Sequence, residues 1–107
     1  MKGGVKTRAK PPLRVPPALQ VTVLENGYSE LREVPGQGWC GLLPFTFTWA
    51  IVVKLTPGGY AHRYCYEHHQ DAALALQAWS GKGHPSGPWI KYKGAGIDLL
   101  NPKLQDA

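Results

Sequence analysis

Histidine and cysteine side chains between positions 62 and 69 are the residues of this sequence best suited to chemistry. His62, Cys65, His68 and His69 lie close together along the chain, and Cys40 could join them in space. Structural zinc sites need four converging ligands and usually contain a closely spaced cysteine pair, which this sequence lacks. If His62 and Cys65 lie on one strand, their spacing points them to opposite faces. We therefore expect no metal site and no cofactor.

A thiolate–imidazole pair is the second chemistry that these residue types allow, with Cys65 beside His62 or His69. The alternating pattern around Cys65 instead predicts a small buried side chain opposite Ala50, and Cys40 falls in a predicted loop with no identifiable partner. The seven carboxylates are scattered, and no glycine-rich loop opens a helix to hold a phosphate. Because the usual catalytic roles have no candidates, we expect that the protein is not an enzyme.

Basic side chains give the sequence a formal net charge of +5, and their distribution bears on nucleic-acid binding. Five of them precede position 15, whereas the remaining chain has seven basic and seven acidic residues and is neutral. The basic arm is a candidate for phosphate contacts, and a smaller basic patch is expected around Trp89. The candidate residues are Lys2, Lys6, Arg8, Lys10 and Arg14 in the arm, and Lys82, His84, Lys91 and Lys93 near Trp89.

Aromatic side chains offer two further kinds of binding surface. Four of them would form a stacking platform for bases if their sheet face were open. Others lie in predicted loops, where aromatic residues either anchor protein partners or cover the core. The platform residues are Trp49, Tyr60, Tyr64 and Tyr66; the loop residues are Trp39, Leu42 and Leu43 in 38–44 and Trp89 and Tyr92 in 81–96. We expect protein binding, with self-association as a homodimer left open and direct nucleic-acid binding as the alternative.

Two predicted β-hairpins carry most of these residues. Alternating apolar side chains predict the strands, and glycine-containing turns predict the reversals. The first hairpin has strands over 19–23 and 28–34 around Asn26-Gly27, and the second has strands over 46–55 and 60–67 around the turn 56–59. The charges of the second strand suit an exposed sheet edge. Counting back from the second turn predicts pairs that share one aromatic face: Leu55–Tyr60, Val53–His62, Ile51–Tyr64 and Trp49–Tyr66.

One predicted helix begins at His68 or His69 and ends near Ser80. Its apolar stripe needs a sheet face to cover, and we expect it to cover the aromatic face of the second hairpin. The stripe consists of Ala72, Ala75, Leu76 and Trp79. Residues 89–93 alternate again and predict a last short strand or extended segment. The expected fold is α+β, with an antiparallel sheet of two hairpins (four or five strands) and one helix packed on one face.

The chain is expected to form a single domain over residues 18–102. Residues 1–17 hold four prolines among basic residues and predict a disordered, proline-rich basic arm, and residues 103–107 predict a polar tail. No window approaches the roughly eighteen apolar residues of a membrane span. Two cysteines without a secretion signal predict free thiols in a reducing compartment, and we expect the cytoplasm.

Several short stretches resemble a known group of sequences. They are Arg63-Tyr64-Cys65-Tyr66-Glu67, the alanine-rich helix ending in Trp79, Gly87-Pro88-Trp89-Ile90-Lys91 and Lys93-Gly94. Over residues 38–102 the chain resembles short uncharacterised proteins of bacterial prophages. The resemblance implies a phage or mobile-element origin and no particular activity. Small basic phage proteins are often inhibitors of host machinery, including anti-defence proteins. We therefore expect an accessory protein that binds and inhibits a host protein or a protein–nucleic acid complex.

Overall fold

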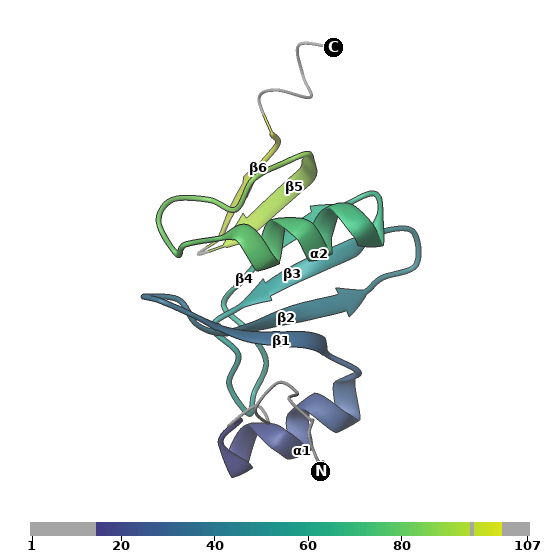
Figure 1. Ribbon diagram of the computed structural model, residues 1–107. Coiled ribbons are helices and arrows are strands. Elements are labelled where there is room, and N and C mark those ends of the chain that lie inside the picture. Colours follow the sequence, from purple (N-terminus) through teal and green to yellow (C-terminus); the bar gives the residue numbers. More distant parts are fainter. Residues whose placement is uncertain (1–14, 95, 102–107) are drawn as a thin grey trace, which may run out of the picture.

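The fold is an antiparallel sheet with two helices. The computed structural model describes residues 15–94 and 96–101. Its six strands are neighbours in chain order (Figure 1), which confirms the predicted α+β class but adds strands and a helix to it. The elements are α1 (Pro17–Asn26), β1 (Ser29–Val34), β2 (Gly38–Pro44), β3 (Trp49–Val53), β4 (His62–Tyr66), α2 (His69–Ala78), β5 (Trp89–Gly94) and β6 (Ile97–Leu99).

The segment 19–23, predicted as a strand, is helical and belongs to α1. Pro17 occupies the start of the helix, where its fixed φ is already helical and its missing N–H costs nothing. Gly27 ends the helix with a φ of 75°, and its N–H donates to the Val23 carbonyl at 3.0 Å. A glycine in this conformation is a common helix end. The pair Asn26-Gly27 therefore terminates a helix rather than turning a hairpin, and the predicted arm boundary at 17 falls inside α1.

The apolar segment 39–44, predicted as a loop, is the second strand of the sheet. β2 lies between β1 and β3 and pairs with both. Cys40 and Leu42 are fully buried on the face that α2 covers. Glycine suits position 41 because a Cβ there would lie 3.1 Å from the Ser29 carbonyl oxygen on β1 and would also displace the end of the Leu31 side chain. In the sequence this glycine suggests a loop, but in the structure it permits close packing of two strands.

The register of the central hairpin agrees with the prediction at three pairs. Trp49 pairs with Tyr66, Ile51 with Tyr64 and Val53 with His62. The strand is shorter than predicted because Lys54 leaves the extended conformation with a φ of 61°. The predicted pair Leu55–Tyr60 is therefore wrong: Leu55 donates its N–H to the Trp39 carbonyl at 2.9 Å and is buried in the cluster on the opposite face.

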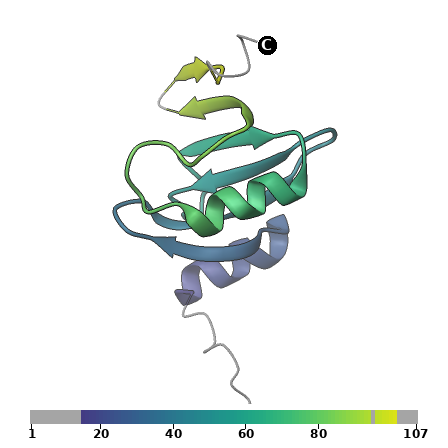
Figure 2. The same ribbon diagram turned by 45° about the horizontal axis from the view of Figure 1, so that its top comes forward.

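Helix α2 lies on the aromatic face of the sheet, as predicted (Figure 2). All four residues of its predicted stripe are buried, and they form one cluster with Ile51, Tyr64, Tyr66 and Trp89. Burying a leucine or an aromatic side chain of this kind contributes about 2–3 kcal/mol each. Arg32 on β1 also holds the end of the helix: its Nη1 donates to the Leu76 and Trp79 carbonyls at 2.8 and 2.5 Å. These carbonyls would otherwise have no partner at a helix end.

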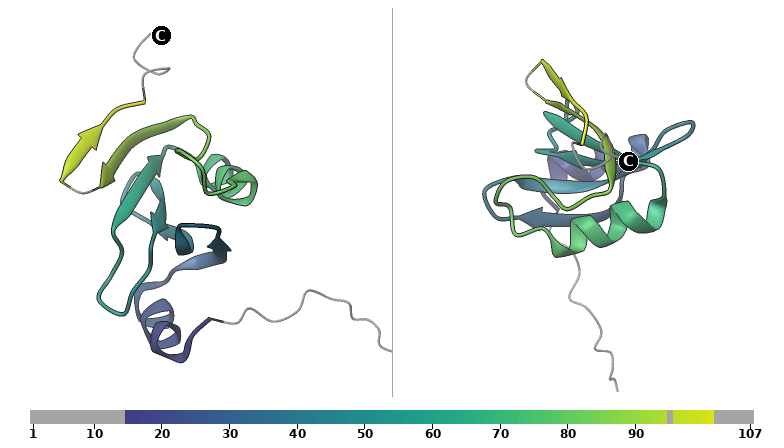
Figure 3. Two further views of the ribbon diagram at one scale, coloured as in Figure 1. Left: turned by 90° about the vertical axis from the view of Figure 1, so that its left-hand side faces the viewer. Right: turned by 90° about the horizontal axis from the view of Figure 1, so that it is seen from above.

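Helix α1 belongs to a second apolar cluster, on the sheet face turned away from α2. Leu19 is buried there with Tyr28, Ala50, Val52 and Leu55. The helix lies at the β1 end of the molecule, beside the loop between β3 and β4 (Figure 3), and Thr22 Oγ1 donates to the Pro57 carbonyl of that loop at 3.2 Å. At β4 and β5 no helix lies over this second face within the described chain. Among the described residues, neither of the two ten-residue helices is long enough to cross a bilayer.

The α2 contact makes a specific prediction for stability. Leu76 is 0% exposed, whereas Leu74 on the same helix is 60% exposed. We expect Leu76→Ala to lower the free energy of unfolding by about 2–5 kcal/mol, and Leu74→Ala to change it by less than about 0.5 kcal/mol. Urea unfolding followed by tryptophan fluorescence measures both. Equal losses in the two variants would contradict the assignment of this helix face to the core.

Candidate functional site

The histidines that could hold a metal are directed to different neighbours. His62 Nδ1 is hydrogen-bonded to Tyr92 Oη at 2.8 Å. His69 Nε2 lies 2.9 Å from Glu30 Oε2, and its ring meets the Trp49 ring edge-on at 4.5 Å. Within residues 15–94 and 96–101, no three histidine, cysteine, aspartate or glutamate side chains gather as a metal site would require.

The two cysteines are free thiols with raised pKa values. Burial raises the pKa of Cys40 to about 11, and the residue lies inside strand β2 rather than on the predicted loop. Burial also raises the pKa of Cys65, against the opposing charges of Arg63 and Lys91. Cys65 pairs with Ala50 as predicted and is half-buried. Near neutral pH both thiols stay protonated, and a protonated thiol is a poor nucleophile.

The predicted stacking platform is covered. Tyr64 and Tyr66 are buried under α2 and the loop 80–88, and their hydroxyls hold that loop in place. Tyr66 Oη donates to the Ser86 carbonyl at 2.8 Å, and Tyr64 Oη is hydrogen-bonded to His84 Nδ1 at the same distance. Because both rings serve the core, they offer no surface to a base. Tyr60 alone of the four lies toward the opposite face.

The predicted basic patch around Trp89 is divided between the two sides of the sheet. Trp89 is 5% exposed and belongs to the core beneath the loop 80–88. It is therefore a core residue and not an exposed anchor for a partner. Tyr92 lies half-buried on the same side, stacked on Tyr64 with 4.4 Å between ring centroids. Lys91 and Lys93 pair with Cys65 and Arg63 of β4 and so point to the other face. Lys82 stays in the loop after α2, and the five basic residues of the arm lie outside the described residues.

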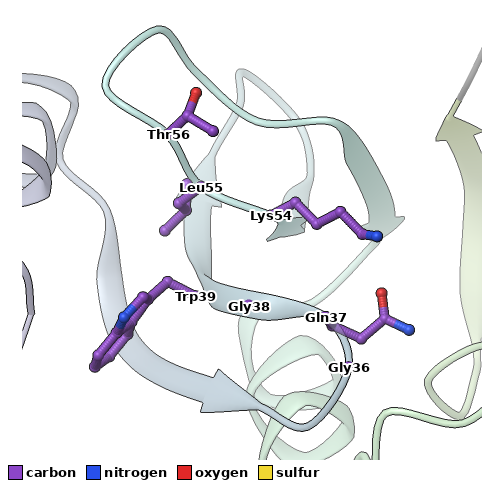
Figure 4. Close-up of a pocket in the computed structure, with 7 residues that line it drawn as sticks. All are labelled: Gly36, Gln37, Gly38, Trp39, Lys54, Leu55 and Thr56. Atoms are coloured by element: carbon purple, nitrogen blue, oxygen red, sulfur yellow. The ribbon is translucent and has the colours of Figure 1, made fainter.

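Trp39, the remaining sequence candidate, is half-buried on β2. It lines a pocket of about 350 Å³ between two turns (Figure 4). The other lining residues are Gly36, Gln37, Gly38, Lys54, Leu55 and Thr56. In Figure 4 the Trp39 indole extends to one side beneath Leu55, while Lys54 and Gln37 extend to the other. The pocket therefore has no set of polar groups converging on one point, which is what a small-molecule site requires.

The structure instead places cations and rings together on the second face of β4 and β5. We call this surface the open sheet face, and it consists of Phe45, Tyr60, Arg63, Cys65, Lys91 and Lys93. The Arg63 guanidinium lies 5.3 Å from the Phe45 ring centroid and donates from Nη1 to Tyr60 Oη at 3.3 Å. The hydrogen bond to Tyr60 raises the pKa of Arg63. Arg63 is therefore a fixed positive charge held between two rings.

The charges of the open sheet face are mostly uncompensated. Lys91 Nζ lies 3.4 Å from Asp98 Oδ2 on β6, whereas Lys93 makes no ion pair with any described residue. The contacts that hold the Arg63 guanidinium over this face are to neutral side chains, Phe45 and Tyr60. Acidic residues are concentrated elsewhere, on β1 and near the start of α2: Glu30, Glu33, Glu67 and Asp71. The open sheet face thus carries three cations together with the Asp98 carboxylate at its β6 edge.

Comparisons with known proteins give no relative for this chain: no family model, no curated protein and no solved structure matches it. The resemblance to prophage proteins stays a prediction.

The buried Cys40 thiol predicts a loss of stability at high pH. Its pKa is about 11 in the folded chain against an ordinary value of 9.0. The unfolded chain therefore loses the proton first, so the stabilisation is complete below pH 9 and is lost as the pH rises through 11. Between pH 9 and 11 the free energy of unfolding should fall in both proteins. We expect the fall to be smaller in Cys40→Val, by roughly 2 kcal/mol, because this variant has no thiol to ionise.

Urea unfolding at several pH values on both sides of this interval tests the Cys40 prediction. Tyr64 and Tyr66 also have raised pKa values, but they are present in both proteins, so the comparison isolates the thiol. An identical alkaline loss in the two proteins would show that Cys40 ionises as readily in the folded chain as in the unfolded one.

Proposed function

We propose that this protein acts by binding an acidic macromolecular partner through the open sheet face, without performing chemistry on it. As a small phage-type accessory protein in the cytoplasm of a bacterial host, it would inhibit a host protein or a protein–nucleic acid complex. The observation that carries the proposal is the placement of Arg63, Lys91 and Lys93 side by side on a face that no described helix covers. Like charges brought together in this way repel one another, and a partner of opposite charge relieves that repulsion.

The state of the titratable side chains supports binding rather than catalysis. The thiols have raised pKa values, and the histidines considered above are engaged with Tyr92, Tyr64, Glu30 and Trp49. A nucleophile needs a lowered pKa or an adjacent base, and the described cysteines have neither.

The charge distribution supports an acidic partner. Arg63, Lys91 and Lys93 outnumber the Asp98 carboxylate beside them, and such a local excess of positive charge raises the association rate of a polyanion, with a strong dependence on salt. The basic arm adds to this attraction through its five positive charges, and direct binding of nucleic acid through the arm is the second candidate function.

Two lysines provide a matched test of the proposed function. Lys93 lies on the open sheet face and Lys82 in the loop after α2; both are exposed, and changing either to glutamate alters the net charge equally. On a heparin column, used as a generic polyanion, we expect Lys93→Glu to elute at clearly lower salt than Lys82→Glu. Thermal unfolding should be the same in both variants. Equal elution would mean that net charge or the arm governs binding, and would refute a role for this face.

A further inference from the structure

We infer that the open sheet face binds single-stranded nucleic acid, with the strand's backbone along Arg63, Lys91 and Lys93 and its bases against phenylalanine rings. This inference rests on the proposed function and names the chemical class of the partner that the face contacts. Proteins that bind single strands without reading sequence combine a row of cations with rings on which successive bases stack. Here the cations lie beside the Phe45 ring, which contacts Arg63, and the exposed Phe47 follows in the same loop.

The cations form a compact cluster on two neighbouring strands. Lys91 and Lys93 are two residues apart on β5, which places them about 7 Å apart on one face, and Arg63 lies directly across from Lys93 on β4. Asp98 lies beside these cations: it is the cross-strand partner of Lys93 on β6, and its Oδ2 lies 3.4 Å from Lys91 Nζ. A polymer with a charge on every residue can neutralise such a cluster with neighbouring groups, and each contact releases counterions.

The rings come from the loop between β2 and β3. Phe45 is 38% exposed and lies under the Arg63 guanidinium, and Phe47, two residues further along, is 88% exposed. The Arg63 guanidinium and the Phe45 ring together form a mixed cation and ring surface. Base stacking on such groups tolerates any sequence because every base has a flat π surface. Bases paired within a duplex are already stacked, so these rings can engage only unpaired ones.

The shape of the face favours a nucleic acid over an acidic protein. Protein interfaces derive most of their affinity from large side chains anchored in pockets. Two pockets of the described residues lie elsewhere: one of about 350 Å³ beside Trp39 and one of about 220 Å³ beside α1 and Leu31. The floor of the open sheet face between the cations is the small Cys65 side chain on a strand. The face therefore offers cations and rings to a partner. Neither of these pockets opens on it to receive an anchoring side chain.

Fluorescence anisotropy with the full chain tests this inference. The probes are a labelled oligothymidylate of about 20 nucleotides, a mixed-sequence duplex of equal length, and poly-L-glutamate as a competitor. We expect the single strand to bind more tightly than the duplex and poly-L-glutamate to compete weakly. Phe47→Ala and Phe45→Leu should each weaken single-strand binding about tenfold without changing the salt dependence. Lys93→Glu should reduce the slope of log affinity against log salt by about one.

Two control variants separate the outcomes. Leu74→Ala removes an exposed apolar side chain from α2, and Lys82→Glu removes a charge away from the face; both should bind like the unmodified protein apart from a small net-charge effect. If the phenylalanine variants match Leu74→Ala while Lys93→Glu still weakens binding and poly-L-glutamate competes fully, the partner is an acidic protein and this inference is wrong. If Lys93→Glu also matches Lys82→Glu, the proposed function fails with it.

Discussion

The packing of α2 on the aromatic face of the central hairpin determines the rest of this structure. Side chains of a strand alternate between faces, so burying Ile51, Tyr64 and Tyr66 under the helix directs their neighbours Arg63 and Cys65 to the opposite side. The pairing of β5 with β4 then adds Lys91 and Lys93 to that side. The location of the charged surface is thus a consequence of where the apolar stripe of one helix is buried.

The sequence predicted those elements whose local pattern and tertiary role agree. The central hairpin has strict alternation and a glycine turn, and α2 has an apolar stripe with an acidic first turn. Helix α1 was not predicted because Leu19, Val21 and Val23 alternate as in a strand. Contacts of Leu19 and Thr22 with the rest of the protein instead favour the helix. Such a segment has weak local preferences, and tertiary contacts decide its conformation.

The candidate site was only partly accessible to the same reasoning. The predicted register already placed Arg63 and Cys65 away from the aromatic face, and extending it to β5 would have added both lysines. Two features prevent the register from being extended to β5 by counting. The pairing next to Tyr66 is irregular, and the preceding loop folds over Trp89, where its Ser86 carbonyl accepts a hydrogen bond from Tyr66 Oη. The position of Phe45 over the sheet depends on its contact with Arg63, a distant pair that no local pattern encodes.

Arg32 links the first strand of the sheet to the end of α2 through two carbonyls. β1 is an edge strand with a register irregularity and a charged sequence, features that discourage pairing with another chain. Because one guanidinium bridges the two elements, β1 cannot detach from β2 without exposing the final turn of the helix. Local opening at this edge should therefore involve strand and helix together, so their backbone amides would form one hydrogen-exchange unit although more than forty residues separate Arg32 from the carbonyls it binds.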